Sequence, residues 1–374
     1  MLRQRLHTSQ YSFFDKLKSI DYFLVFLILI LAAISFMVMY STDGGKIAYH
    51  TKNHFIRFSV FFVLFLCLSF VRIRFWFISS YIFYLIILAM LVMVFYFGVT
   101  ASGSQRWINL YFINIQPSEL MKIAIIICLA RYYHHMQSAD VQNFKNILQP
   151  LLLLIIPCIF VTAQPGLGTA ILIAISGIFV MWIAGLNIKY FVYTGIMFIV
   201  SAPFIISLLK PYQKIRILTF FNPERDPLGS GYQIIQSKIA IGSGGFFGKG
   251  FLKGTQSYLE FLPEKHTDFI FTLFAEEFGF IGCVFLLLIY ILLIYRIVRI
   301  GFLSKSFFAK LYCFGFSAAI FTYIFVNISM VLGIVPIVGS PLPILSYGGS
   351  SMMTIMTGFA IVMSCKIYNK EQIS

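Results

Sequence analysis

Ionisable residues fall inside apolar stretches of this 374-residue chain, where a charged side chain is costly and usually has a function. Glu119 and Lys122 lie three residues apart in a stretch that begins at Pro117, a residue suited to a first helical turn. Residues at this spacing share a helix face and can form an ion pair. The pair either lines a water-filled cavity or simply holds helices together, and both interpretations remain open. Glu276 and Glu277 form a pair of adjacent acids, for which we expect a structural role, with a basic residue on another helix as partner.

A further group, Glu264, His266 and Asp268, lies where a polar loop meets an apolar stretch. A carboxylate and an imidazole at a membrane surface can carry out acid–base chemistry. The N-terminus of a helix also favours anions such as phosphate. A simpler role is open as well, because Thr267 could cap the helix that follows. These residues are therefore candidate catalytic and binding groups for an anionic ligand.

Two other polar segments interrupt the apolar pattern. Residues 99–116 include Arg106 and Trp107, which either anchor the chain at the membrane interface or offer a cation to a lipid phosphate. Residues 341–350 combine two prolines with Gly-Gly around Ser346, which predicts a broken helix start. Irregular backbone at membrane depth must lie against protein or a cavity, so we expect this segment near the same cavity mouth.

The composition places these residues in a membrane protein. Hydrophobic residues make up 60% of the chain and charged residues 11%, and the mean hydropathy is +0.90. A soluble protein could not cover its surface with so few charges. The apolar stretches are long enough to cross a bilayer as helices and lack the alternation of membrane strands. We therefore predict an all-α integral membrane protein, a single domain over residues 1–374. Its ten transmembrane helices are expected over residues 22–41, 55–71, 75–98, 117–134, 148–163, 168–185, 190–209, 268–295, 307–334 and 345–365.

The longest polar connection, residues 210–267, is a long external loop between the seventh and eighth predicted helices. Within it, Tyr232 to Ile241 alternates polar and apolar residues at roughly helical spacing, which favours a segment lying along the membrane interface. An ordinary solvated loop is the alternative, but it would leave Ile234 and Ile239 exposed to water.

Lysine and arginine are distributed unevenly between the connections. Fifteen lie before the first span, in links after even-numbered spans or in the tail, whereas the opposite short loops hold only Lys46, Lys52 and Arg106. The positive-inside rule then makes both termini cytoplasmic. The net charge of +15 follows mainly from this topology, so it does not indicate nucleic-acid binding. The six cysteines fall in predicted spans without a C-x-x-C spacing, so no disulfide or zinc site is expected among them.

Several longer motifs occur in order along the chain. They are residues 116–122 (QPSELMK), 248–256 (GKGFLKGTQ), 261–271 (FLPEKHTDFIF), 275–277 (AEE) and 341–351 (PLPILSYGGSS). Together with the ten-span layout, they resemble the SEDS family (shape, elongation, division and sporulation) over nearly the whole chain. Details of the long external loop look more like the RodA (elongation) branch than the FtsW (division) branch.

The resemblance implies a peptidoglycan glycosyltransferase of the bacterial cytoplasmic (inner) membrane. Such an enzyme polymerises lipid II, an undecaprenyl-pyrophosphate-linked substrate, on the outer face, together with a class B penicillin-binding transpeptidase and other elongation-complex proteins. The family's catalytic aspartate corresponds to Asp268, the expected general base, and its intramembrane acid and lysine correspond to Glu119 and Lys122. Lys122, Arg106 or Lys253 would steady the leaving pyrophosphate. No organic cofactor is expected, and a divalent cation, Mg or Mn, stays open as an alternative source of positive charge.

One position departs from the family pattern. Gly166 stands in an external turn where the family usually has an aspartate, so a metal or substrate role for this turn is in doubt. Two other functions share the same features: a flippase that moves lipid II or another lipid-linked substrate, and a non-catalytic scaffold for cell-wall machinery. The flippase would tolerate changes at Asp268 that leave the cavity open, whereas the scaffold would tolerate loss of Asp268, Glu119 and Lys122 alike.

Overall fold

Each of the ten predicted spans corresponds to one helix of the computed structural model, which describes residues 12–101, 104–109, 114–164, 166–208, 211–226, 229–255, 262 and 264–373. The prediction of an all-α membrane fold is confirmed. In chain order these helices are α2 (Tyr22–Thr42), α3 (Tyr49–Ser69), α4 (Ile73–Phe97), α5 (Pro117–His134), α7 (Phe144–Ala163), α8 (Leu167–Ile183), α9 (Ile188–Leu208), α13 (Ile270–Leu303), α14 (Phe307–Val331) and α15 (Gly349–Ile367).

Seven helices in the described part of the chain are long and apolar enough to cross a membrane: α2, α3, α4, α7, α13, α14 and α15. Helices α8 and α9 contribute shorter apolar segments. Helix α5 differs from these helices in carrying two charged residues in its first two turns, Glu119 and Lys122. Nearly all residues of α5 are nevertheless buried. It packs against α4, α8 and α14 at the centre of the bundle, so its charges face protein and not lipid. The outer helices instead expose large apolar side chains, as the lipid-facing surface requires.

The remaining elements lie mainly in the connections. They are the helices α1 (Phe13–Lys18), α6 (Ser138–Val141), α10 (Pro211–Phe221) and α11 (Ser230–Gly244), the 3-10 helix η1 (Pro223–Arg225), and the strands β1 (Val99–Ala101), β2 (Ser104–Asn109) and β3 (Asn114–Ile115). The antiparallel sheet β1–β2–β3 was not predicted from the sequence. Helix α11 contains the predicted helical piece of the long loop, and it packs on α13 with Ile234 buried and Ile239 exposed.

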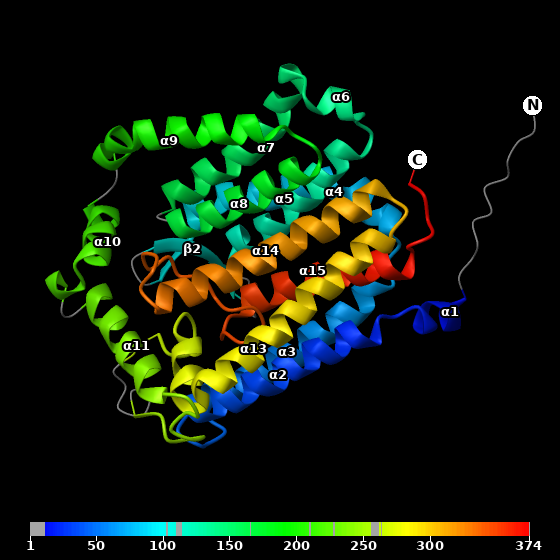
Figure 1. Cartoon of the computed structure of the whole chain (residues 1–374). Coiled ribbons are helices and arrows are strands. Elements are labelled where there is room, and N and C mark those ends of the chain that lie inside the picture. The colour runs from blue at the N-terminus through cyan, green and yellow to red at the C-terminus, as the bar shows by residue number, and fades with distance from the viewer. Residues whose placement is uncertain are drawn as a thin grey trace, which may run out of the picture.

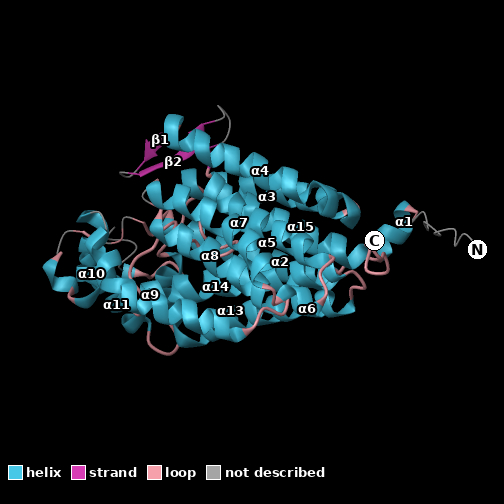
Figure 2. Ribbon diagram, turned by 90° about the horizontal axis from the view of Figure 1, so that it is seen from above, coloured by secondary structure: helices cyan, strands magenta, loops and turns pink. Residues whose placement is uncertain are grey.

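Helix α1 and the C-terminus lie at the same end of the bundle in both views (Figures 1 and 2), as an even number of crossings requires. Helix α13 extends to Leu303, beyond the predicted end at residue 295. Its extra turns carry Arg296, whose guanidinium forms an ion pair with Asp21 at 2.8 Å near the start of α2. This buried carboxylate also caps α2 by accepting a hydrogen bond from the backbone N–H of Leu24.

Helix α13 is interrupted at Gly279, whose φ of +64° is a left-handed conformation. The interruption exposes backbone groups that must find partners inside the protein. The loop after α11 supplies them: the N–H groups of Lys249 and Gly250 donate to the carbonyls of Glu276 and Glu277, each at 3.0 Å. In return, the N–H groups that follow Gly279 donate to carbonyls of the same loop.

The two glutamates beside this interruption are structural, as predicted. Lys249 Nζ lies 2.7 Å from Glu276 Oε1, and the backbone N–H of Thr255 donates to the same oxygen at 2.9 Å. Ser41, at the end of α2, donates to Glu277. The basic partner comes from a loop and not from another helix. Because both carboxyl groups have polar partners, they fasten the loop after α11 to α13 and α2.

We predict that Gly279→Ala destabilises the protein by about 2 kcal/mol or more, because an L-residue disfavours this backbone conformation and the new Cβ would lie 2.2 Å from the backbone nitrogen of Gly248. Thermal unfolding of the detergent-solubilised protein measures the change. The matched control is Gly195→Ala, since no atom lies within 4 Å of the added Cβ there. Equal unfolding temperatures for the two variants would contradict the prediction.

Candidate active site

Asp268 lies in the turn that precedes α13, at the end of the bundle opposite to α1 and the C-terminus. The side-chain amide of Asn327, on α14, donates to the carbonyl of Asp268 at 2.9 Å and to the carbonyl of Ser340 at 2.7 Å. The backbone of Asp268 is therefore fixed by a fully buried side chain. None of the described residues donates a hydrogen bond to its carboxylate, which stays available for a ligand.

The segment between α14 and α15 holds the same turn from the other side. Ser346 Oγ donates to the carbonyl of Thr267 at 2.7 Å and accepts a bond from the N–H of Leu342 at 2.7 Å. The N–H of Tyr347 donates to the carbonyl of His266 at 2.9 Å. Ser346 thus contacts the turn that carries Asp268, where its side chain is buried and its hydroxyl positions the backbone.

The pKa of Asp268 is raised to about 7, chiefly by burial and also by the carboxylates of Glu264 and Glu119, against the opposing effect of the Arg216 and Arg106 guanidinium groups. Charges of both signs therefore surround this carboxyl group. Arg106 comes from β2, where its Nε donates to the carbonyl of Gln164 at 3.3 Å. Glu264, Glu119 and Arg106, three of the site residues named from the sequence, thus act on Asp268 electrostatically.

Arg216 was missed by the sequence analysis. It lies on α10, and one guanidinium nitrogen donates to the carbonyl of Ile337 at 3.4 Å, which ties the long loop to the segment before α15. No sequence signal singles it out, because the same long loop also contains Lys214, Arg225 and other basic residues. Lys253 is different, since it is exposed and is not among the charged residues that shift the pKa of Asp268.

Glu119 and Lys122 form a buried ion pair, with Lys122 Nζ 2.6 Å from Glu119 Oε1. Tyr323 of α14 donates its hydroxyl to the other carboxylate oxygen at 2.9 Å, and Lys122 Nζ lies 4.2 Å from the centre of the Tyr323 ring. These contacts join α5 to α14, which is the helix-pairing role that the sequence left open. The charged group of Lys122 is therefore engaged inside the protein.

The other predicted site residues lie around the turn. Glu264 is exposed and accepts a hydrogen bond from Thr267 Oγ1 at 2.8 Å. The interpretation of Thr267 as a helix cap is therefore wrong, because its hydroxyl bonds backwards to Glu264 and Phe269 occupies the N-cap position of α13. Trp107 is partly buried on β2. Burial lowers the pKa of His266 to about 4, assisted by the charges of His50 and Lys265, so its imidazole is neutral at neutral pH.

Gly166 forms the N-cap position of α8 with no room for a side chain. A Cβ there would lie 2.8 Å from the carbonyl oxygen of Val161 and 2.9 Å from Val161 Cγ1. The N–H of Gly166 also donates to that same carbonyl at 2.9 Å. The turn is therefore shaped around glycine, and an aspartate would require the backbone to move.

The sequence as a whole agrees with this architecture. Residues 20–371 match the model of the FtsW/RodA/SpoVE family, described as cell cycle proteins. The chain belongs to this family. The match covers all ten predicted spans, so the resemblance drawn from the motifs is confirmed.

Relatives of this FtsW/RodA/SpoVE protein carry enzyme names. The peptidoglycan glycosyltransferase MrdB of Escherichia coli (strain K12) is 46% identical over 291 residues, which is 77% of each chain. The probable peptidoglycan glycosyltransferase FtsW of Buchnera aphidicola subsp. Acyrthosiphon pisum is 36% identical over 360 residues, covering 93% of this chain and 88% of that one.

Solved structures share the fold. A chain of a peptidoglycan synthase complex, solved for the coordination of polymerization and crosslinking, superimposes with a TM-score of 0.81 at 29% identity and covers 94% of this chain and 98% of that one. The rod shape determining protein RodA of Thermus thermophilus gives a TM-score of 0.72 at 24% identity, over 94% and 98% of the two chains. The latter comparison confirms the fold.

We predict that Lys122→Met destabilises the protein by about 3–5 kcal/mol, because it leaves the Glu119 carboxylate buried without its counter-charge. The double variant Glu119→Gln/Lys122→Met removes both charges, so we expect a smaller loss than in the single variant. Chemical unfolding in detergent micelles measures the three free energies. A double variant less stable than Lys122→Met would contradict the interpretation of the pair as mutually compensating.

Proposed function

We propose that this chain polymerises lipid II into glycan strands on the outer face of the bacterial cytoplasmic membrane, with Asp268 as general base. The chain is a peptidoglycan glycosyltransferase of the FtsW/RodA/SpoVE family. One observation carries the assignment of the base: the turn that contains Asp268 is held from two sides, while the Asp268 carboxylate has no hydrogen-bond donor among the described residues. General-base catalysis requires a carboxylate that is held in position and is free to accept a proton from the substrate.

The reaction needs a base at the acceptor sugar and positive charge at the leaving pyrophosphate. Asp268 would remove the proton from the acceptor hydroxyl as that oxygen attacks the lipid-linked sugar. Arg106 and Arg216 act on Asp268 electrostatically from β2 and α10. Guanidinium groups suit a pyrophosphate because they bond pairs of its oxygens. In this proposal the two arginines stabilise the leaving pyrophosphate instead of Lys122, because Lys122 forms an ion pair with Glu119.

A divalent cation remains part of the proposal. The carboxylates of Asp268 and Glu264 are the oxygen donors that Mg²⁺ and Mn²⁺ prefer, and Glu264 is exposed to solvent. These two residues would hold such an ion, which would add positive charge beside the leaving pyrophosphate.

The fold and the relatives support an orientation and a set of partners. Helix α1 and the C-terminus share one end of the bundle, and the excess of basic residues predicted for that side supports cytoplasmic termini, with Asp268 outside. The related chain in a peptidoglycan synthase complex supports assembly with a transpeptidase, which the resemblance identifies as class B. The identity to MrdB supports a role in elongation, and with it contacts to other elongation-complex proteins.

We predict that Asp268→Asn abolishes polymerisation of labelled lipid II, with a rate at least ~10²-fold lower, because the amide cannot accept the proton. The substitution keeps the shape of the side chain and the backbone bonds from Asn327, and gel filtration checks that the fold is kept. Strand synthesis at the wild-type rate would overturn the assignment of the base. Transfer of lipid II across liposomes without strand growth in either protein would favour the flippase.

A matched pair of variants tests which cations matter. Arg216→Ala should slow polymerisation about tenfold or more, because a charge beside Asp268 is lost. Lys253→Ala should have little effect, because Lys253 is exposed and is not among the charged residues that shift the pKa of Asp268. The polymerisation rates of both variants are measured with the same lipid II assay. A larger loss for Lys253→Ala than for Arg216→Ala would contradict the arrangement described above.

A further inference from the structure

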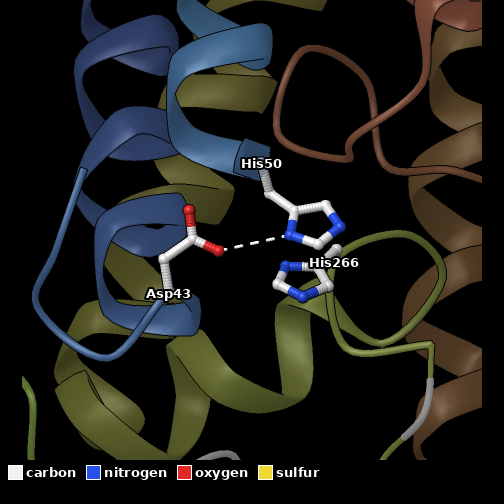
Figure 3. Close-up of side chains that lie close together, drawn as sticks. All are labelled: Asp43, His50 and His266. Atoms are coloured by element: carbon white, nitrogen blue, oxygen red, sulfur yellow. Dashed lines mark hydrogen bonds and ion pairs between the residues drawn. The ribbon is translucent and has the colours of Figure 1, made fainter. Parts of the chain in front are cut away.

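Three side chains of the kind that bind metal ions converge beside the Asp268 turn. Asp43 follows the last residue of α2, His50 lies in the first turn of α3, and His266 belongs to the turn before α13. One ligand atom from each lies within 4.8 Å of the others. Figure 3 shows the three side chains meeting, with a ring nitrogen of His266 beside the contact between Asp43 and His50.

The cluster is only partly satisfied by the contacts within it. His50 Nδ1 lies 3.2 Å from Asp43 Oδ1. The two imidazole rings stack with centroids 3.7 Å apart and planes at 15°. His266 Nδ1, by contrast, is buried without a hydrogen-bond partner. The hydrogen bond between Asp43 and His50 and the stacking of the two rings therefore leave Nδ1 of His266 without a partner. A buried polar atom in this state is unfavourable.

The surroundings prepare the carboxylate as a ligand. Asp43 Oδ2 accepts hydrogen bonds from the N–H of Thr51 at 2.9 Å and from Thr51 Oγ1 at 2.7 Å, which fix the direction of the other oxygen. Hydrogen bonds of this kind orient ligands in metal sites. The Asp43 side chain is 4% exposed, whereas that of His50 is 36% exposed, so the cluster is open to solvent on one side only.

We propose that Asp43, His50 and His266 bind a divalent transition-metal ion, for which Zn²⁺ is the best fit. Two imidazole nitrogens and one carboxylate oxygen form a set that zinc takes in proteins, with the fourth position left to water. Mg²⁺ and Ca²⁺ are disfavoured because they prefer oxygen ligands. Binding draws the two rings out of their parallel stack, since a metal ion lies in the plane of each imidazole that holds it.

Such an ion would fasten the α2–α3 connection to the turn that carries Asp268. His266 and Asp268 are two residues apart, and the carbonyl of His266 is already bonded to Tyr347. The zinc site is a positioning element and takes no part in the transfer itself. It rests on its own ligands and stands whether or not the chain polymerises lipid II.

The test is a direct measurement of bound zinc on the full-length protein in detergent. The protein is stripped with a chelator, loaded with Zn²⁺, desalted and measured by mass spectrometry of the metal. We expect one equivalent in the wild type and its loss in His50→Ala and in Asp43→Asn. Thr51→Val should weaken binding about tenfold, because it removes a hydrogen bond to the ligating carboxylate. Excess Mg²⁺ should not displace the zinc.

Two controls separate loss of the site from loss of the fold. His135→Ala removes an exposed histidine at the far end of α5 and should keep the full equivalent. His50→Gln should unfold at the wild-type temperature without metal, yet gain no stability from Zn²⁺, whereas the wild type should be stabilised by it. A wild type that retains no zinc would overturn the proposal. So would His50→Ala holding as much zinc as the wild type.

Discussion

The buried amide of Asn327 is the contact on which the active end of the molecule depends. It bonds two carbonyl groups from separate irregular segments, that of Asp268 and that of Ser340. A bilayer offers no water to satisfy such groups, so irregular backbone can exist there only if protein supplies its partners. The hydroxyl of Ser346 and the N–H of Tyr347 complete the same joint. These bonds give the irregular backbone of the turn that presents Asp268 its partners inside the protein.

Most of the helical architecture could be predicted from the sequence. The runs near residues 22–41 and 307–334 are long, apolar and bounded by polar residues, so the bilayer thickness alone defines them. The sheet β1–β2–β3 escaped prediction because its strands are only two to six residues long and lie in a loop that reads as polar. The end of α13 was predicted too early because Arg296 resembles the boundary of a span, whereas the helix continues past it and Arg296 pairs with the buried carboxylate of Asp21.

The candidate site was only partly visible in the sequence. Asp268 and Glu264 are close in the chain, and the motif around them indicated their grouping. Arg216 and Asp43 come from distant elements, and no local pattern links them to residue 268. Their places depend on how α10 and the α2–α3 connection fold back on the bundle. The role of Lys122 likewise depends on Tyr323, which lies 201 positions further along the chain. The Tyr323 ring contacts Lys122, and its hydroxyl donates to Glu119.

The shape of the turn at Gly166 has an evolutionary consequence. A Cβ at this position would meet a backbone oxygen, that of Val161, which no side-chain exchange at residue 161 can remove. A lineage carrying this glycine cannot regain an acidic group there by one nucleotide change without deforming the end of α7. An acid could return at this position only together with a backbone shift at the end of α7. The geometry of that helix end and the residue type at position 166 are therefore linked.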